Sequence, residues 1–404
     1  MKKHILVISQ YFYPEHFRIN DICIEWINRG YKVTVLTGIP NYPEGKFYKG
    51  YGLFKKRKEK YKEIDIIRLP LIPRGNNPIM LALNYMSFVF SGFIWKVFSR
   101  IKPDYVFIFE VSPMTQALPG IWIAKKRRIP CYIYVQDLWP ENVEIVTGIK
   151  NKTIINLIGK MVDYIYKNSN KIFTTSKSFI KSIEKRGIPI EKLIYWPQYA
   201  EDFYRPTLKT EVKEIPLDNT FNIIYTGNIG KAQGLDILPE TAKILKNKYK
   251  NIKVRFNIVG EGRYKENLIK NIQNKKIEDM FNFIPKQPPN KIPEYLSFCD
   301  VAFLSLSSNI IFSMTIPAKL QSYMACGIPI LACAQGETMT IIQEANAGYC
   351  SMPGDPDKLA ENIVKMVNTP IEHIQQMGEN ALRYYNKNFN KDILLDQIDE
   401  YFNI

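Results

Sequence analysis

The sequence predicts an α/β protein built from two successive doubly wound domains. Short apolar runs that suit buried parallel strands alternate along the chain with amphipathic stretches at helical spacing. A polar, proline-bearing segment at residues 200–220 interrupts this alternation, which then restarts. The length of 404 residues is enough for two α/β domains. We expect an N-terminal domain over residues 1–200, a C-terminal domain over 201–385, and a closing segment over 386–404.

The first half begins with a strand at 3–9, a loop at 10–18, a helix at 20–29 and a strand at 31–36. This is the length of a right-handed β-α-β crossover, but its turn lacks the G-x-G-x-x-G dinucleotide fingerprint. Further strands are expected at 64–69, 104–109, 131–135, 171–175 and 193–196, and helices at 115–128, 154–168 and 178–186, giving a parallel sheet of about seven strands. The long loop from Thr37 to Lys60 has a length that is usually functional.

One stretch of the first half is apolar enough that a membrane-spanning helix has to be considered. Ile79 to Trp95 carries no charge and is near the lower limit for a membrane-spanning helix. Asn84, Ser87 and Ser91 interrupt it, and Lys96 follows. We favour a helix that is buried or lies on a membrane surface over a transmembrane helix.

The second half repeats the pattern. Strands are expected at 221–225, 253–259, 281–284, 301–306 and 330–333, and helices at 235–247, from 317, at 356–367, at 371–386 and at 391–402. Ligands of such sheets bind at the carboxyl ends of the strands. With two Rossmann-like domains facing each other, the expected site is the cleft between them.

Composition narrows the classes of partner. The formal charge of +16 suits phosphate-bearing small molecules, an anionic membrane or nucleic acid. The absence of zinc-finger spacing and of a glycine-aromatic RNA-binding signature disfavours nucleic acid. The six cysteines form no C-x-x-C pair, which predicts reduced thiols in a cytoplasmic protein, and three histidines make a histidine-rich metal site unexpected. The start of the chain predicts no signal peptide.

The stretch from Ile316 to Pro329 predicts an anion site. A helix that starts at Pro317 would direct backbone N–H groups and its positive dipole end at whatever precedes it. Lys319 in its first turn runs against the dipole preference for acids, which suggests a second donor to an anion. A surface lysine at an ordinary turn is the alternative. Glycine loops at 227–230 and 260–262, with Arg263 adjacent, favour a nucleotide diphosphate.

The first half contributes candidate acids at the carboxyl ends of its strands: Glu15, Glu110, Asp137 and Glu141. Each is more often a helix cap or a solvated acid than a catalyst. Asp137 stands out because it follows a buried strand and precedes Trp139 and Pro140. Arg18 could reach an anion across the cleft, and a surface salt bridge is its alternative reading.

The chain carries a series of short motifs in a characteristic order: Gln10–Glu15, Phe17–Asp21, Pro40–Gly45, Gln136–Pro140, Thr226–Gly230 with Gln233–Leu235, Val259–Gly262, Ile316–Lys319 and Tyr323–Pro329. On these motifs the whole chain resembles the retaining, GT-B-fold glycosyltransferases of family 4. It is most similar to the branch of bacterial WbuB-like N-acetyl-L-fucosamine transferases of O-antigen and capsule synthesis.

The resemblance implies a UDP-sugar donor held mainly by the C-terminal domain, no cofactor and no metal. Pro285 and Lys286 would lie beside the base, Gly260 and Gly262 would permit close backbone approach, and the helix at 317 would receive the diphosphate. The implied donor-binding residues are Arg18, Gly227, Asn228, Gly230, Gln233, Gly260, Gly262, Arg263, Pro285, Lys286, Ile316, Pro317, Ala318, Lys319, Ser322 and Glu337. The implied acceptor residues are Glu15, Phe17, Asn41 and Tyr42, and the implied catalytic residues are Asp137, Gln136 and Glu110. The last helix would pack back on the N-terminal domain.

The chain departs from the family pattern at several positions. Met314 and Ser322 occupy the places of a frequent glutamate pair, Asn228 and Gln233 those of the usual phosphate-binding cations, and Gln136 that of a frequent histidine. We expect Lys319 and Arg18 to replace the missing cations, and Glu337 or Glu344 to hold the ribose. The sequence contains no Asp-x-Asp metal motif at these loops.

The resemblance therefore implies transfer of an N-acetylated, 6-deoxy sugar from a UDP-sugar to a lipid-linked saccharide. The protein would lie in the cytoplasm against the anionic inner face of the plasma membrane, with no nucleic-acid partner. Two alternatives stay open at this point. One is a UDP-sugar 2-epimerase of the same fold, and the other is a non-catalytic, membrane-peripheral carbohydrate-binding protein.

Overall fold

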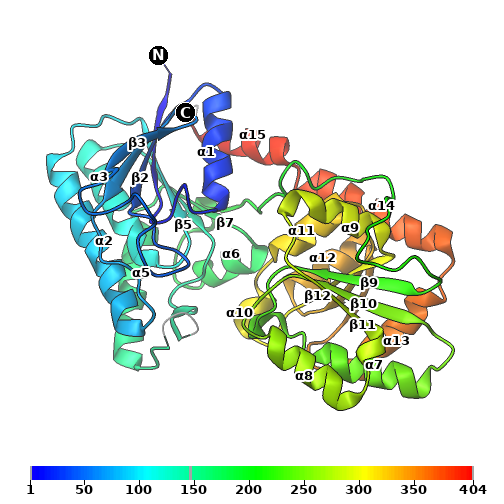
Figure 1. Ribbon diagram of the computed structural model, residues 1–404. Coiled ribbons are helices and arrows are strands. Elements are labelled where there is room, and N and C mark those ends of the chain that lie inside the picture. The colour runs from blue at the N-terminus through cyan, green and yellow to red at the C-terminus, as the bar shows by residue number, and fades with distance from the viewer. Residues whose placement is uncertain (1, 145–147, 403–404) are drawn as a thin grey trace. The chain divides into compact units, whose positions relative to one another are not determined.

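The computed structural model describes residues 2–144 and 148–402 and divides into two compact units (Figure 1). Unit 1 comprises the chain up to Trp196 together with the residues from Tyr401 onwards, whereas unit 2 runs from Pro197 to Glu400. The division falls a few residues before the predicted boundary at 200. Residues 403 and 404 of the predicted closing segment lie outside the described residues. Each unit has its own largely parallel sheet, which confirms the predicted class of two doubly wound α/β domains.

Unit 1 contains an eight-stranded sheet in the order β3-β4-β2-β1-β5-β6-β7-β8. Neighbouring strands are parallel except for β3 and β4, and Val7 of β1 lies opposite Val35 and Phe107. β5 and β6 are buried along their whole length, as expected when helices cover both faces of a sheet. The strands are β1 His4–Ile8, β2 Lys32–Gly38, β3 Lys58–Tyr61, β4 Ile64–Leu69, β5 Tyr105–Glu110, β6 Cys131–Val135, β7 Lys171–Thr174 and β8 Leu193–Tyr195.

The antiparallel strand β3 falls at the end of the segment predicted as a long loop. Its sequence, Lys-Glu-Lys-Tyr, has no apolar run because none of its side chains is buried. Lys62 and Glu63 join it to β4 with φ of 45° and 65°. Two-residue hairpin turns with positive φ are usually marked by Asn-Gly or Gly-Gly, and this turn has neither residue type. The sequence therefore contains no recognisable pattern for this strand.

The longest helix of unit 1 is α2, Pro78–Phe98, which extends beyond the predicted 79–95. Asn77 caps it by accepting a hydrogen bond from the Met80 N–H at 2.8 Å. The helix packs closely on α3, since a Cβ at Gly92 would lie 2.3 Å from Pro119 Cγ. The other helical segments are α1 Arg18–Asn28, η1 Met114–Gln116, α3 Ala117–Arg127, α5 Lys152–Lys167, α6 Lys177–Glu184 and η2 Ile190–Lys192.

The end of the chain is part of unit 1. Phe402 is fully buried, with its ring centroid 5.4 Å from that of Trp26 and 5.2 Å from that of Tyr105. The Tyr105 hydroxyl donates to the Phe402 carbonyl, and the Tyr132 hydroxyl donates to the Tyr401 carbonyl at 2.9 Å. The last turn of α15, Lys391–Phe402, therefore completes the aromatic core of unit 1.

Unit 2 contains a parallel six-stranded sheet in the order β11-β10-β9-β12-β13-β14. Counted from β9, this is the strand order 3-2-1-4-5-6 of a doubly wound fold, with its switch point between β9 and β12. Unit 1 has the same reversal between β1 and β5. The strands are β9 Phe221–Thr226, β10 Val254–Val259, β11 Phe281–Ile284, β12 Val301–Ser305, β13 Ile330–Cys333 and β14 Gly348–Ser351.

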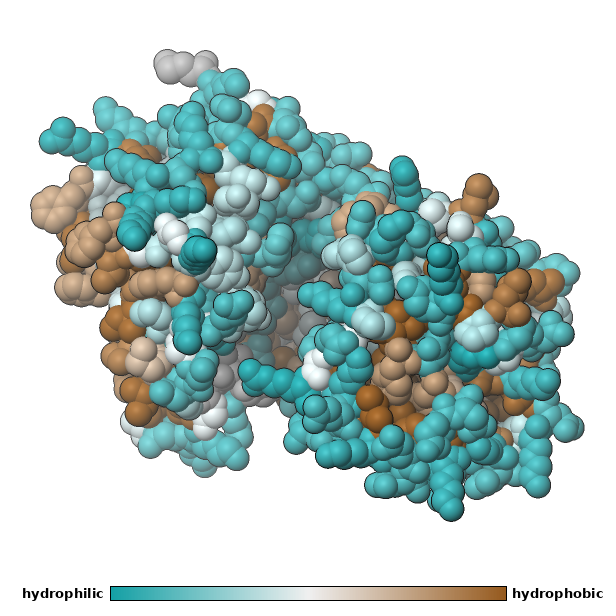
Figure 2. Space-filling view, in the orientation of Figure 1, coloured by the Kyte–Doolittle hydropathy of each residue, from teal (hydrophilic) through white to brown (hydrophobic). Residues whose placement is uncertain are grey.

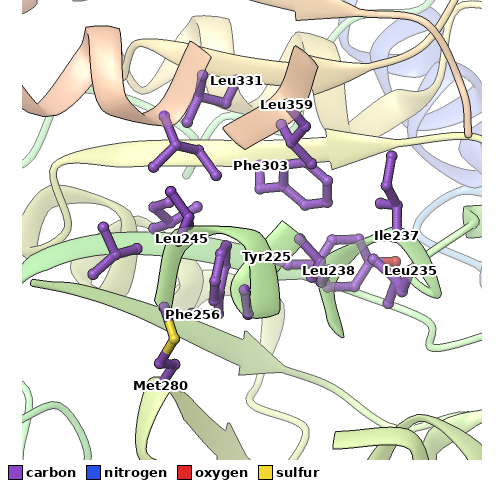
Figure 3. Close-up of a cluster of buried hydrophobic side chains, with 14 of the residues drawn as sticks. Tyr225, Leu235, Ile237, Leu238, Leu245, Phe256, Met280, Phe303, Leu331 and Leu359 are labelled. Atoms are coloured by element: carbon purple, nitrogen blue, oxygen red, sulfur yellow. The ribbon is translucent and has the colours of Figure 1, made fainter. Parts of the chain in front are cut away.

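The core of unit 2 lies between the sheet and its flanking helices, and Figure 3 shows part of it. Phe256 and Phe303 project from neighbouring parts of the sheet, and Leu238, Leu245 and Leu359 meet them from the helices. These side chains are almost fully excluded from solvent, so the core provides a rigid base for the loops at the carboxyl ends of the strands.

The helical segments of unit 2 include several that the sequence reading left out. α8 has only two buried residues, Leu268 and Ile272, and β14 is a short edge strand, so their apolar patterns are weak. The segments are η3 Lys231–Gln233, α7 Ile237–Lys248, α8 Lys265–Lys275, η4 Glu278–Met280, η5 Pro289–Lys291, α9 Ile292–Phe298, α10 Ile310–Ser313, α11 Ala318–Ala325, α12 Glu337–Ala345, α13 Pro356–Val367, α14 Ile371–Asn388 and the part of α15 up to Glu400.

Candidate active site

In unit 2 the predicted anion-binding residues meet at the carboxyl end of β9, beside the switch point. Lys319, in the first turn of α11, extends its side chain to the loop that follows β9. Its Nζ donates a hydrogen bond to the Tyr225 hydroxyl at 2.6 Å and lies 4.2 Å from the centroid of that ring. A Cβ at Gly227 would lie 3.0 Å from the same Nζ. The lysine side chain therefore lies against the glycine loop and is not a remote surface residue.

The surroundings of Lys319 favour its neutral form. Burial lowers the pKa of this amine to about 8. The Tyr225 hydroxyl in turn donates to the Asn228 carbonyl at 2.6 Å, and burial raises the pKa of this phenol. The three groups form a chain from the lysine to the backbone of the glycine loop. An anion bound here would stabilise the charged state of the amine.

A second contact aligns α11 with β9. The Thr226 N–H donates to the Tyr323 hydroxyl at 3.0 Å, and the Thr226 and Tyr323 hydroxyls are 3.2 Å apart. Pro317 caps the helix with φ of −71° and ψ of 138°, so α11 starts at Ala318, one residue later than predicted. The first-turn N–H groups of a helix lack partners within the helix, and this end is suited to an anion.

The glycines at 260 and 262 are explained by loop packing. A Cβ at Gly260 would lie 1.9 Å from the Gly227 carbonyl oxygen, and one at Gly262 would lie 2.2 Å from the Ile229 carbonyl oxygen. The Ile229 N–H also donates to the Glu261 carbonyl at 2.9 Å. The predicted close backbone approach is therefore between two loops of the protein, which fix each other's shape.

Neutral side chains complete the β9 loop. Gln233 Oε1 accepts hydrogen bonds from the Gly230 N–H at 3.1 Å and from Asn228 Nδ2 at 3.3 Å. Both residues were predicted as donor-binding, and the structure brings them together at the loop beside Tyr225 and Lys319. They hold the loop in shape and contribute no charge.

The remaining predicted donor-binding residues differ in placement. Pro285 and Lys286 are exposed after β11, and Arg263 is exposed after β10. Ile316 is buried before α11. Ser322 is buried, and its Oγ donates to the Ala318 carbonyl at 3.1 Å, so this hydroxyl is used inside the helix. Contact of the Ser322 side chain with the donor stays a prediction.

The two glutamates considered for the ribose are separated by α12. Glu337 begins this helix next to the segment before α11: a Cβ at Gly336 would lie 2.0 Å from the Ser313 carbonyl oxygen. Glu344 lies near the other end, where it accepts a hydrogen bond from the Tyr384 hydroxyl at 3.0 Å. Glu344 is therefore occupied by α14, and Glu337 is the better placed candidate.

In unit 1, Glu110 and Asp137 follow neighbouring strands, β5 and β6. Glu110 is fully buried, and its Oε2 accepts a hydrogen bond from the Asp137 N–H at 3.4 Å. Burial, reinforced by the charge of Asp137, raises the pKa of Glu110 well above its usual range. Gln136 lies between the two strands' ends and donates through its N–H to the Glu110 carbonyl at 2.8 Å. Burial and the raised pKa both favour the protonated form of Glu110, which supports Asp137 from within the fold.

Asp137 is held by a serine that the sequence reading missed. Asp137 Oδ2 accepts hydrogen bonds from the Ser112 N–H and Oγ, both at 2.7 Å. Trp139 Nε1 donates to the same Ser112 Oγ at 3.1 Å, and Asn142 Nδ2 donates to Asp137 Oδ1 at 3.4 Å. The carboxylate is half-buried and fixed in orientation, as a positioned polar group at a strand end should be.

Two of the predicted acceptor residues have structural roles. Glu15 Oε1 accepts hydrogen bonds from the N–H groups of Asn41 at 2.8 Å and Tyr42 at 2.7 Å, and Oε2 accepts from that of Phe12 at 3.3 Å. Burial raises the pKa of Glu15 to about 7 despite these bonds. Asn41 is fully buried and donates through Nδ2 to the Ile39 carbonyl at 2.8 Å. Both side chains hold the loops together, and their contact with the acceptor stays a prediction.

The other two predicted acceptor residues form an aromatic cluster with Tyr11. Ring centroids are 5.2 Å apart for Tyr11 and Phe17, 5.4 Å for Tyr11 and Tyr42, and 5.4 Å for Phe17 and Tyr42. The Arg74 guanidinium lies 5.3 Å from the Tyr42 centroid and donates to the Tyr11 hydroxyl at 3.0 Å. Sequence spacing could not reveal Arg74, because its partners lie far away along the chain.

Tyr85 links this cluster to Asp137. Burial raises the pKa of Tyr85 to about 12, and the charges of Arg74, Asp137 and Tyr42 all act on its hydroxyl. The aromatic cluster and Asp137 therefore belong to one region of unit 1. Arg18 starts α1 and lies close enough to Tyr134 for its charge to oppose the rise in that phenol's pKa. Since Arg18 belongs to unit 1 and Lys319 to unit 2, their cooperation on one anion stays a prediction.

Residues 2–144 and 148–402 contain no recognisable metal centre. No group of three His, Cys, Asp or Glu side chains in this part of the chain is arranged to hold a metal ion. Independence from metals and cofactors stays a prediction.

Comparison with known proteins supports the class that this geometry suggests. Residues 209–384 match the family model described as glycosyl transferases group 1. The chain is 26% identical over 320 residues to WcaI of Escherichia coli strain K12, a glycosyl transferase assigned to colanic acid biosynthesis, covering 75% of this chain and 76% of that protein. It is 23% identical over 349 residues to the alpha-monoglucosyldiacylglycerol synthase of Streptococcus pneumoniae strain R6, covering 83% of this chain and 74% of the synthase.

The fold is similar to that of HepE from Anabaena, solved in complex with UDP. The TM-score is 0.68 at 15% sequence identity, and 100% of each chain is covered. The chain therefore has the GT-B fold of nucleotide-sugar glycosyltransferases. The match of its second unit to the group 1 glycosyltransferases supports the resemblance at the level of the family and leaves the WbuB-like branch as a proposal.

Proposed function

We propose that the protein is a retaining glycosyltransferase that moves a sugar from a UDP-sugar to a lipid-linked saccharide in surface polysaccharide synthesis. The sugar we propose is N-acetylated and 6-deoxy, of the N-acetylfucosamine type. The observation that carries the proposal is the position of Lys319 at the glycine loop after β9, 2.6 Å from the Tyr225 hydroxyl. A half-buried amine at a switch point is suited to a pyrophosphate.

The donor would occupy the carboxyl ends of the unit 2 strands. Lys319 and the start of α11 would bind the diphosphate, Glu337 the ribose, and Pro285 and Lys286 the base. Support for UDP comes from HepE, which was solved in complex with UDP and whose fold this chain shares. Arg18 would be a second cation for the diphosphate.

The chemical step requires stabilisation of the leaving UDP. As the bond between the sugar and the phosphate breaks, negative charge grows on the phosphate oxygens. Lys319 and the α11 N–H groups are held in place by Tyr225 and Tyr323, so they can stabilise this charge without reorganising. In the proposed retaining mechanism the leaving phosphate accepts the proton of the acceptor hydroxyl. No metal is needed for this step.

The acceptor would be bound by unit 1. The cluster of Tyr11, Phe17 and Tyr42 offers rings for a sugar face, and Arg74 offers a guanidinium for a phosphate. Asp137, positioned by Ser112 and supported by Glu110, would orient the attacking hydroxyl. Of the two relatives, one is assigned to colanic acid synthesis and the other is a glycolipid synthase, which supports a polysaccharide or lipid acceptor.

We further propose that the protein works in the cytoplasm against the anionic inner face of the plasma membrane, with no nucleic-acid partner. The formal charge of +16 supports an anionic surface. The glycolipid named in the S. pneumoniae relative is also a membrane lipid.

The function is tested by incubating the full chain with radiolabelled UDP-linked N-acetylhexosamines, their 6-deoxy relatives and bacterial membranes. We expect label to move into the lipid fraction from one 6-deoxy, N-acetylated donor, with the anomeric configuration retained. Conversion of the donor without membranes would instead indicate a 2-epimerase. Binding of saccharide with no turnover of any donor would indicate a carbohydrate-binding protein and overturn the proposal.

A further inference from the structure

The outer face of α2 presents a continuous apolar row to solvent. Its members recur at the spacing of one helix face and are exposed by 43% to 78%: Ile79, Leu83, Met86, Phe90, Phe93, Ile94, Val97 and Phe98. Figure 2 shows this row as a brown patch along the left edge of unit 1, where Figure 1 places α2. Scattered apolar residues on a surface are ordinary, but a contiguous row marks an interaction surface.

The chain that surrounds this row carries positive charge without negative charge. It has no acidic residue between Asp65 and Asp104, nor between Glu110 and Asp137. Lys96 Nζ lies 5.4 Å from the centroid of the Phe93 ring. The basic end of α3 reaches the same helix end, where Lys126 Nζ donates to the carbonyls of Lys96 and Val97 at 2.9 Å each. An apolar row edged by cations matches the boundary between acyl chains and anionic headgroups.

The opposite face of α2 fixes the helix in the protein. Asn84 is fully buried, its Nδ2 donates to the Ile72 carbonyl at 2.6 Å, and its Oδ1 accepts from Gln10 Nε2 at 2.7 Å. Among the described residues, α2 alone is long and apolar enough to cross a membrane by length and composition, a criterion that core helices also meet. Crossing the bilayer would break the contacts of Asn84, Phe88 and Gly92 with unit 1. A position in the plane of the interface keeps them.

We propose that the outer row of α2, with Lys96 and the basic end of α3, docks the protein on an anionic bilayer with the helix lying in the interface. A protein with an apolar groove could cover the row. The cations at its C-terminal end, Lys96 and Lys126, favour phosphate headgroups. The inference names the surface for the membrane location proposed above, and it can fail while the transferase activity stands.

The test is co-sedimentation of the full chain, without donor, with vesicles of phosphatidylglycerol and phosphatidylethanolamine or of phosphatidylcholine alone. We expect binding to the anionic vesicles that weakens with added salt. Met86→Glu with Phe90→Glu should lower the partition coefficient by about tenfold or more, because charge replaces the inserted row. Lys96→Gln with Lys126→Gln should lower it by about fivefold per charge. Leu217→Glu, at a leucine 73% exposed in unit 2, is the matched control and should bind as the wild type does.

Several outcomes would overturn the proposal. They are wild-type binding by the Met86→Glu, Phe90→Glu variant, equal binding to neutral vesicles, and resistance of the bound protein to alkaline carbonate, which would indicate a spanning helix. Failure of the wild type to bind any vesicle would point to a protein partner instead. Melting temperatures show whether each variant is folded. Transfer to a water-soluble saccharide acceptor, which should be unchanged in the α2 variants, separates this inference from the proposed function.

Discussion

Lys319 carries its charge where desolvation opposes it. Its folded-state pKa of about 8 is below the ordinary value of 10.5, so folding favours loss of the proton. Between these two pH values the unfolded chain binds more protons than the folded chain, and stability rises with pH. Below pH 8 the charged amine is a constant cost to the fold. A bound pyrophosphate would remove this cost, which is typical of a functional cation.

We expect Lys319→Met to weaken UDP binding by about tenfold or more while leaving the melting temperature at pH 7 unchanged or higher. Wild-type UDP affinity should fall as pH rises through about 8, and the variant should lack this dependence. Lys358→Met, at an exposed lysine paired with Glu361 at 2.8 Å, is the control and should leave affinity unchanged. Calorimetric titration measures both. Equal UDP affinity in Lys319→Met and the wild type would count against a phosphate site here.

Glu110 gives a second prediction, because its pKa is raised in the folded protein whereas that of Lys319 is lowered. Its folded-state pKa is raised by burial and by Asp137, whereas an unfolded glutamate ionises near about pH 4.3. The folded wild type therefore loses stability as pH rises above the unfolded value towards the folded value. Glu110→Gln removes this titration. We expect the melting temperature of Glu110→Gln, relative to that of the wild type, to be higher at about pH 8 than at about pH 4.5. A pH-independent difference would show that Glu110 is ionised in the fold.

At the scale of elements, the two glycine loops of unit 2 act as one structure. Gly260→Ala would place a Cβ 1.9 Å from the Gly227 carbonyl oxygen, which only a backbone shift can relieve. We expect a loss of about 3 kcal/mol in unfolding free energy, together with weaker UDP binding because the β9 loop moves. Gly354 also has a positive φ, 83° against 153° for Gly260, but nothing lies within 4 Å of its added Cβ, so Gly354→Ala should cost only about 1 kcal/mol. Urea unfolding and UDP titration of the two variants test this prediction. Equal losses of unfolding free energy in Gly260→Ala and Gly354→Ala would refute the loop-packing explanation.

Strands and helices with strong apolar patterns were predictable from the sequence, and those without them were not. β1, β5 and β13 are buried apolar runs and fall where the sequence placed them. β3 and α8 lack that pattern because they are exposed. The same limit applies to the site. Lys319 was recognisable from its place at a helix start, whereas the contacts of Ser112 and Arg74 join residues that only the folded sheet brings together.

Buried polar residues were the hardest to interpret from the sequence. Glu15 and Asn41 belong to motifs of the resemblance, and a motif does not distinguish a group that touches substrate from one that holds a loop. Their hydrogen bonds show a structural role: the Glu15 carboxylate accepts from three backbone N–H groups, and Asn41 has no exposed surface. We infer that these residues hold the loops of the acceptor region in shape.

At the scale of the whole molecule, each unit has its own sheet and core, but the chain passes between the units twice. It enters unit 2 at Pro197 and returns to unit 1 at Tyr401. The returning residues supply part of the unit 1 core, because Phe402 lies against Trp26, Tyr105 and Tyr132. Unit 1 therefore cannot complete its core until the chain has traversed the whole of unit 2.

This arrangement predicts a selective effect of a substitution at the chain end. Phe402→Ala removes a fully buried ring, which should cost about 3–5 kcal/mol and lower the melting temperature of unit 1 by about 10 °C. In differential scanning calorimetry we expect one of two transitions to move, and Phe303→Ala, in the unit 2 core, to move the other. A single transition that shifts equally in both variants would show that the units unfold together. Separate shifts would mean that the last turn of α15 stabilises unit 1 although most of that helix belongs to unit 2.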